Sequence, residues 1–230
     1  MSRKRKNGNN GNINPIQTNS KQVHKELKPK TENQADYIRA MIESHITICA
    51  GPAGTGKTAC AVGLACEHLV QEKIEQIIVT RPVIETGRQG LGYLPGDIAT
   101  KMHPYIIPVV EELDIYLGKV RRELFMTNGK IKIEPLEYMR GRNFHQSFII
   151  LDEAQNATIK QVKMLLSRIG RGSTVVLTGD TDQSDLFEDT MGLKLCLDRL
   201  PNTRGVSIIN LTTDDIVRHD IIARVLEKLK

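Results

Sequence analysis

The sequence predicts an α/β protein with a mostly parallel β-sheet that is covered by helices on both faces. Short runs of continuous apolar residues alternate with segments of helical periodicity, which is typical of strands buried on both sides. We expect strands at residues 46–50, 77–80, 131–134, 148–151, 174–178 and 206–211. At 230 residues, the chain is long enough for one such domain and too short for two large ones.

Helical periodicity is clear in three segments outside these strands. They begin near Asn33, at Lys57 and at Thr158. In the third segment Thr158 and Gln161 form a capping box, and Gly170 is expected to end the helix. The stretch from about residue 82 to 108 is rich in glycine and proline, which predicts a long exposed excursion.

Positive charge is concentrated at the N-terminus. Residues 1–30 hold eight lysines and arginines and one acidic residue, whereas the whole chain has a net charge of +5. This stretch is rich in asparagine and glycine, so we expect a disordered basic tail over 1–30 and a single domain over 31–230. Such an arm either holds nucleic acid by counterion release or only improves solubility.

Composition argues against a membrane or secreted protein. No apolar run approaches the roughly 18 to 20 residues that span a bilayer, and no apolar segment follows the basic start as in a secretory signal. The four cysteines lack the spacing of a metal site, and reduced core residues are the expected role. The sequence therefore predicts a cytoplasmic protein without a membrane partner.

The stretch GPAGTGKT, residues 51–58, fits the pattern G-x-x-x-x-G-K-[ST] between an expected strand and an expected helix. Its glycines allow backbone N–H groups to point at phosphate oxygens, and the start of the helix adds positive charge. Lys57 is expected at the β- and γ-phosphates and the Thr58 hydroxyl at Mg²⁺. The predicted nucleotide-binding residues are Gly51, Pro52, Ala53, Gly54, Thr55, Gly56, Lys57 and Thr58.

Two further strands end in polar residues that suit the same site. The stretch FIILDEAQN places Asp152 as a second Mg²⁺ ligand and Glu153 as the base that polarises a water molecule for attack on the γ-phosphate. The stretch TVVLTGDTDQ brings Gln183 close, and its amide suits sensing of a γ-phosphate or an attacking water. The carboxyl ends of parallel strands meet at one edge of a sheet, so these groups are expected together.

Rival classes of phosphate-binding protein fit less well. A GTPase needs an Asn-Lys-x-Asp guanine reader, which the sequence lacks. In a P-loop kinase, Glu153 and Gln183 would have no role. We therefore expect an ATPase, with a nucleotide-dependent switch or assembly protein and a kinase as open alternatives.

The ordered set of motifs closely resembles the PhoH family, phosphate-starvation-inducible ATPases with a RecA-like core similar to superfamily 1 helicases. The resemblance covers about residues 31–230 and rests on GPAGTGKT, TRPV, LGYLPGD, PY, EPLEYMRGR, FIILDEAQN, TGD with Gln183, and DDIVRH. The chain departs from the family pattern at Gln89 and Gly90, where an acidic residue is expected two positions before the Leu-Gly pair.

The resemblance implies ATP and Mg²⁺ as cofactors and roles for further residues. Gln34 would contact the adenine edge, and Arg81 would lie where helicase cores touch single-stranded nucleic acid. Arg218 would stabilise charge on the transferring phosphate as a catalytic residue, a role also open to Arg140 and Arg142.

A helicase-like mechanism needs an arginine from across the nucleotide. We therefore expect a homo-oligomer, most simply a ring such as a hexamer, in which a neighbouring copy supplies that arginine. Coupling of ATP hydrolysis to binding, remodelling or unwinding of single-stranded RNA is the leading expectation for function. The small number of aromatic residues, four Phe, five Tyr and no Trp, limits stacking on bases.

Overall fold

The computed structural model describes residues 24–82, 98–183, 191–217 and 228, with a six-stranded parallel sheet at the centre. The strand order is β3-β2-β4-β5-β1-β6. All pairs are parallel. The strands are β1 Ile46–Ala50, β2 Gln76–Arg81, β3 Ile131–Pro135, β4 Ser147–Leu151, β5 Thr174–Gly179 and β6 Val206–Asn210. The α/β class and the six predicted strands are confirmed.

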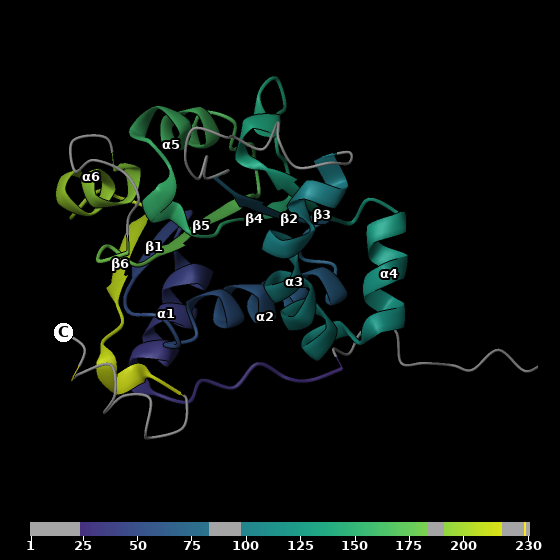
Figure 1. Cartoon of the computed structure of the whole chain (residues 1–230), viewed down its shortest axis with the longest axis horizontal. Helices are drawn as coiled ribbons and strands as arrows, with labels where there is room; N and C mark the ends of the chain where they lie inside the picture. The colour runs from purple at the N-terminus through teal and green to yellow at the C-terminus, as the bar shows by residue number, and fades with distance from the viewer. Residues whose placement is uncertain (1–23, 83–97, 184–190, 218–227, 229–230) are drawn as a thin grey trace, which may run out of the picture.

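Helices cover both faces of this sheet (Figure 1). One face carries α1 Glu32–Glu43, α2 Lys57–Val70 and α3 Ile98–Leu117, with α4 Lys119–Thr127 packed beside α3. The other face carries α5 Ile159–Leu166 and α6 Gly192–Arg199. Successive residues of a strand point to opposite faces, so Phe148 and Ile150 join the first core while Ile149 and Leu151 join the second.

The prediction of an exposed excursion over residues 82–108 is wrong for its C-terminal part, residues 98–108, which are helical. Helix α3 begins at Ile98 and includes both Pro104 and Pro108, two residues that normally argue against a helix. Residues 83–97, including Gln89 and Gly90, lie outside the described part of the chain. The apolar residues Val109, Leu113 and Leu117 of α3 are buried against the first face, which explains why tertiary packing prevails over local propensity.

Helix α5 begins as predicted and ends early. Thr158 and Gln161 form the capping box, but the last helical residue is Leu166 rather than one next to Gly170. The backbone beyond the helix pairs instead with Phe144, whose N–H donates to the Arg168 carbonyl and whose carbonyl accepts from Gly170. This alternative pairing uses the groups that a longer helix would need.

The predicted boundary between tail and domain, after residue 30, lies too far along the chain. His24 N–H donates to the Tyr116 carbonyl of α3 at 2.7 Å, and Leu27 N–H donates to the Glu67 carboxylate of α2 at 2.8 Å. Leu27 also packs against the first core. Residues 24–30 therefore belong to the domain, and residues 1–23 lie outside the described part.

The buried carboxylate of Asp215 connects the segment after β6 to the start of α1 by hydrogen bonds. Asp215, in a short 3-10 turn Thr213–Asp215 beyond β6, is 1% exposed. It accepts hydrogen bonds from Thr31 Oγ1 at 2.5 Å, Asn33 Nδ2 at 2.9 Å and Thr212 N at 2.8 Å. Burial alone would raise the pKa of Asp215, but these hydrogen bonds outweigh it and hold the pKa below its ordinary value of 3.8.

This pKa shift makes stability depend on pH. A carboxyl group with a depressed folded-state pKa stabilises the fold above its unfolded pKa and loses that effect as the pH falls through the lower folded value. Asp215→Asn should therefore reduce the free energy of unfolding near neutral pH by about 1.5–3 kcal/mol. The difference from the parent should shrink below pH 3.8, the ordinary value for this group. Denaturant titrations of both proteins between neutral pH and pH 3 measure the difference in free energy of unfolding. A difference that stays constant over this pH range contradicts the prediction.

Candidate active site

The phosphate loop lies between the end of β1 and the start of α2, where the sequence places it. Gly56 is the N-cap of α2 and has φ of 84°, a left-handed conformation that favours glycine. A side chain at this position would also meet Gln34, whose Nε2 would lie 2.9 Å from an added Cβ. Gly56 thus allows both the turn into the helix and the close approach of α1.

Lys57 lies across the phosphate loop. Its ammonium group donates to the carbonyl of Gly51 at 2.5 Å and to that of Pro52 at 2.8 Å. Burial lowers the pKa of Lys57, and the nearby carboxylates of Asp180 and Glu153 oppose that shift. Phosphate oxygens would provide the negative charge that a partly buried ammonium group favours, so the geometry suits the predicted role of Lys57.

Asp152 lies beside the loop and accepts several hydrogen bonds. Its Oδ1 accepts from the hydroxyls of Thr58 at 2.8 Å and Thr178 at 2.7 Å. Its Oδ2 accepts from Arg81 Nε at 2.9 Å and pairs with a terminal nitrogen of the same guanidinium group. The Thr58 hydroxyl and Asp152 carboxylate are the hard oxygen donors that Mg²⁺ prefers, so these residues fit the metal predicted for them.

Arg81 lies beside Asp152, the predicted Mg²⁺ ligand. Its side chain, 14% exposed, forms an ion pair with Asp152, which is 3% exposed, and it lines the phosphate pocket. Arg81 therefore lines the same pocket as Lys57 and Thr58, and its contact with nucleic acid stays a prediction. The pair neutralises a carboxylate that would be costly to bury alone.

Glu153 directly follows Asp152 and is exposed to the pocket. Its backbone has φ of 54°, an uncommon left-handed conformation for a residue other than glycine. The buried amide of Gln155 donates to Glu153 Oε2 at 2.7 Å, and its oxygen accepts from the Asp180 N–H at 3.1 Å. Gln155 therefore links the predicted base to the turn after β5.

Sequence reasoning missed Gln155 and Thr178. Both lie inside the quoted motifs, and the available signal was a polar side chain near the end of β5 for Thr178 and just after β4 for Gln155. Gln155 also explains Gly179, because a Cβ added there would lie 2.5 Å from the Gln155 side-chain oxygen.

Replacement of Gln155 tests this link. If Glu153 acts as the base that the sequence predicts, Gln155→Leu should lower kcat for ATP hydrolysis by about tenfold with little change in nucleotide affinity, because a loosely held carboxylate orients water poorly. In a Glu153→Gln background, the second change should cost little more if Gln155 acts through Glu153. Steady-state kinetics of the single and double variants measure this, and simple additivity of the two losses contradicts it.

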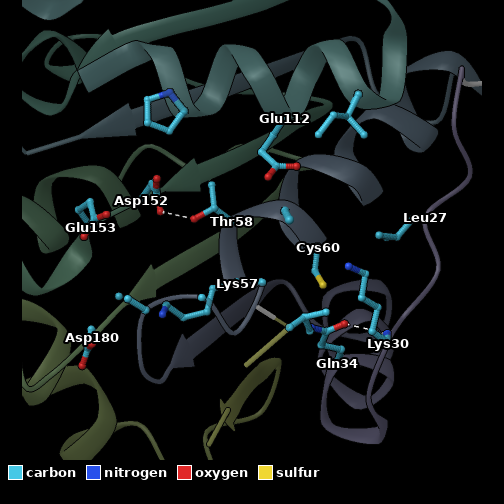
Figure 2. A pocket seen from close by; sticks show the side chains of 18 of the residues that line it. Leu27, Lys30, Gln34, Lys57, Thr58, Cys60, Glu112, Asp152, Glu153 and Asp180 are labelled. Carbon is cyan, nitrogen blue, oxygen red and sulfur yellow. Dashed lines mark hydrogen bonds between the residues drawn. The ribbon is translucent and has the colours of Figure 1, made fainter. Parts of the chain in front are cut away.

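Lys57, Thr58, Asp152 and Glu153 line one pocket of about 520 Å³. Figure 2 shows Lys57, Thr58, Asp152, Glu153 and Asp180 gathered at one end of it. Gln183, which is exposed and whose N–H donates to the Asp180 carbonyl at 3.2 Å, also lines the pocket. The other end is lined by the N-terminal segment and α3, including Leu27, Lys30, Glu112, Ile115 and Tyr116.

The remaining predicted residues divide into three groups. Gln34 is buried at the pocket, where its Nε2 donates to the Thr55 carbonyl and its Oε1 accepts from Lys30 N–H. Its contact with adenine stays a prediction. Arg140 is exposed, and Arg142 pairs with Glu134 and lies over the Phe144 ring. Arg218 lies outside the described residues.

The parallel sheet and this phosphate loop define a P-loop nucleoside-triphosphatase fold of the RecA-like class. Two structures of the large terminase from a thermophilic bacteriophage share it. One aligns with TM-score 0.55 at 12% identity over 87% of this chain and 50% of that one. The second, a complex with ADP, aligns with TM-score 0.51 at 10% identity over 88% of this chain and 50% of that one. These likenesses show the fold alone.

The sequence profile of the PhoH-like protein family matches residues 26–230, so the chain belongs to that family. It is 43% identical over 204 residues to the PhoH-like protein of Bacillus subtilis (strain 168), covering 88% of this chain and 64% of that protein. It is 39% identical over 204 residues to Protein PhoH of Escherichia coli (strain K12), covering 86% of this chain and 56% of that protein. The chain thus spans less than two thirds of the length of these relatives.

In the part of the chain that the structure describes, we find no helix with the length and apolar character needed to cross a bilayer.

Proposed function

We propose that the protein binds ATP with Mg²⁺ in this pocket and hydrolyses it to ADP and phosphate. The observation that carries the proposal is the 2.8 Å hydrogen bond between Thr58 and Asp152, with Glu153 exposed beside it in the same pocket. Thr58 and Asp152 would hold the metal. When bound, Mg²⁺ neutralises negative charge on the β- and γ-phosphates.

Several side chains at this pocket have separate roles in hydrolysis. Lys57 holds the terminal phosphates, and Glu153 accepts a proton from the attacking water. The water oxygen forms a bond to the γ-phosphorus while the bond to the β,γ-bridging oxygen breaks, and ADP leaves. Gln155 keeps the Glu153 carboxylate in place, and Gln183, which lines the same pocket, senses the γ-phosphate.

We propose single-stranded RNA as the coupled substrate. Support comes from Lys25, Lys28 and Lys30, exposed lysines that line the pocket, although Lys28 also pairs with Glu26. Exposed lysines attract a phosphate backbone. Measuring phosphate release from ATP with and without a single-stranded RNA separates the candidate functions. Stimulation supports RNA coupling, unstimulated hydrolysis supports a switch or assembly protein, and phosphate transfer to a small acceptor indicates a kinase.

We further propose a homo-oligomer, such as a ring, in which a neighbouring copy completes the pocket with an arginine. Among the described residues, Arg81 is the arginine that lines the pocket, and it is paired with Asp152. Arg140 fits the role better than Arg142, because Arg142 is already paired with Glu134. Arg218 remains a candidate on sequence grounds.

Light scattering tests the oligomer. With ATP and Mg²⁺ present, the molar mass should be two or more times 25.8 kDa, the mass of one chain. Arg140→Ala should lower hydrolysis on the order of 10³-fold if it acts across the interface, as arginines in trans do. A fully active monomer contradicts the proposal.

A further inference from the structure

The segment after β6 lies directly against the phosphate loop. Leu211 N–H donates to the Ala50 carbonyl at 2.8 Å, and a Cβ added to Gly51 would lie 2.5 Å from the Leu211 carbonyl oxygen. At its other end, Val217 N–H donates to the Gly54 carbonyl at 3.2 Å. We call residues 211–217 the C-terminal strap. Both ends of this strap thus contact the phosphate loop or the residue just before it.

Helix α1 supports the neighbouring carbonyl of the same loop. The side chain of Gln34 donates from Nε2 to the Thr55 carbonyl at 2.9 Å, and Gln34 lies within the pocket lining (Figure 2). Carbonyls of Gly54 and Thr55, consecutive in sequence, are therefore held by two different segments. A loop whose N–H groups turn inward to phosphate needs partners for the carbonyls that turn away.

Asp215 joins these two segments. It lies in the C-terminal strap and accepts hydrogen bonds from Thr31 and Asn33 at the start of α1. Thr31 is the N-cap of α1 and accepts from the Gln34 N–H, so the same hydroxyl links Asp215 to the residue that holds Thr55. One buried carboxylate thus fixes both supports of the loop relative to each other.

We propose that Asp215 is a positioning residue that sets the conformation of the phosphate loop through these two supports. Asp215 is buried and does not line the pocket, and it acts by holding the strap and α1 so that the Gly54 and Thr55 carbonyls face away from the ligand. A preorganised loop binds phosphate without the cost of ordering it. The effect on nucleotide affinity rests on the proposed function, whereas the effect on the empty loop does not.

The chain provides a matched control for Asp215. Asp214 is the preceding residue, carries the same side chain and is exposed. Asp215→Asn and Asp214→Asn therefore remove one carboxylate each from adjacent positions. Asn33→Ala is a milder variant that removes one donor to Asp215 and leaves the carboxylate in place.

Hydrogen exchange of the nucleotide-free full chain gives the first readout. Asp215→Asn should speed amide exchange in residues 53–58 and in the strap, with exchange in α5 on the opposite face unchanged. Asn33→Ala should act in the same direction with a smaller effect, and Asp214→Asn should match the parent. Calorimetric titration with Mg-ADP, well below the melting temperature, should show affinity weakened at least about tenfold in Asp215→Asn.

A role confined to overall stability predicts a different pattern. Asp215→Asn would then melt at a lower temperature, while loop exchange and Mg-ADP affinity stay equal to those of Asp214→Asn, and that result would overturn the proposal. If the parent binds no nucleotide, the proposed function fails, but loop exchange still decides whether Asp215 positions the loop.

Discussion

Replacing Glu153 by glutamine should slow ATP hydrolysis by ~10²–10⁴-fold, the contribution typical of a positioned general base. Binding of ATP should change little, because Glu153 is exposed at the pocket, whereas Lys57 is held by the Gly51 and Pro52 carbonyls and Thr58 by the Asp152 carboxylate. Glutamine keeps the size and the hydrogen-bonding capacity of the side chain but cannot accept the proton from water.

Phosphate release and fluorescent-nucleotide binding measure the two effects separately. Glu43→Gln, at an exposed position in the last turn of α1, makes the same chemical change away from the pocket and should leave both unchanged. Equal hydrolysis rates for Glu153→Gln and the parent would remove Glu153 from the mechanism. A parallel loss of affinity would show that Glu153 serves binding instead.

Lys57→Ala should show the opposite pattern, with nucleotide affinity weakened on the order of 10²-fold. A partly buried ammonium that faces phosphate is costly to remove, because the anion is left without its charged partner. The variant also loses the bonds from Nζ to the Gly51 and Pro52 carbonyls, which should loosen the loop further.

Titration with Mg-ADP measures this loss of affinity. Lys73→Ala is the matched control, since Lys73 is exposed just beyond the C-terminal end of α2. Circular dichroism of both variants establishes that each is folded. Nucleotide affinity equal to that of the parent in a folded Lys57→Ala protein would place the phosphates elsewhere.

The strands could be predicted from the sequence because each is a short apolar run, such as FIIL in β4, that ends in glycine or a polar residue. Helix α3 could not, because Pro104 and Pro108 are local signals against a helix and its stability comes from burial of Val109 and Leu113. The sequence predicts residues 24–30 as part of the tail for a similar reason. Their lysines dominate the composition, whereas the contacts that hold them are the packing of Leu27 and the backbone hydrogen bonds of His24 and Leu27 to distant residues.

Lys57, Thr58, Asp152 and Glu153 line one pocket, as expected from motifs at the ends of neighbouring parallel strands, which open at the same edge of the sheet. Contacts between side chains that are far apart in the chain could not be predicted from the sequence. Arg81 and Asp152 are 71 positions apart, and Thr31 and Asp215 are 184 apart. No local pattern shows that Arg81 pairs with the proposed metal ligand, or that Asp215 of the DDIVRH motif binds the start of α1.

The most direct test of the proposed site is a crystal structure of the full chain with Mg²⁺ and a non-hydrolysable ATP analogue. We expect the metal between the Thr58 hydroxyl and the Asp152 carboxylate, the γ-phosphate at Lys57, and Glu153 facing the open side of that phosphate. A nucleotide bound away from the loop, or a metal that leaves Thr58 and Asp152 untouched, would contradict the proposed ATPase.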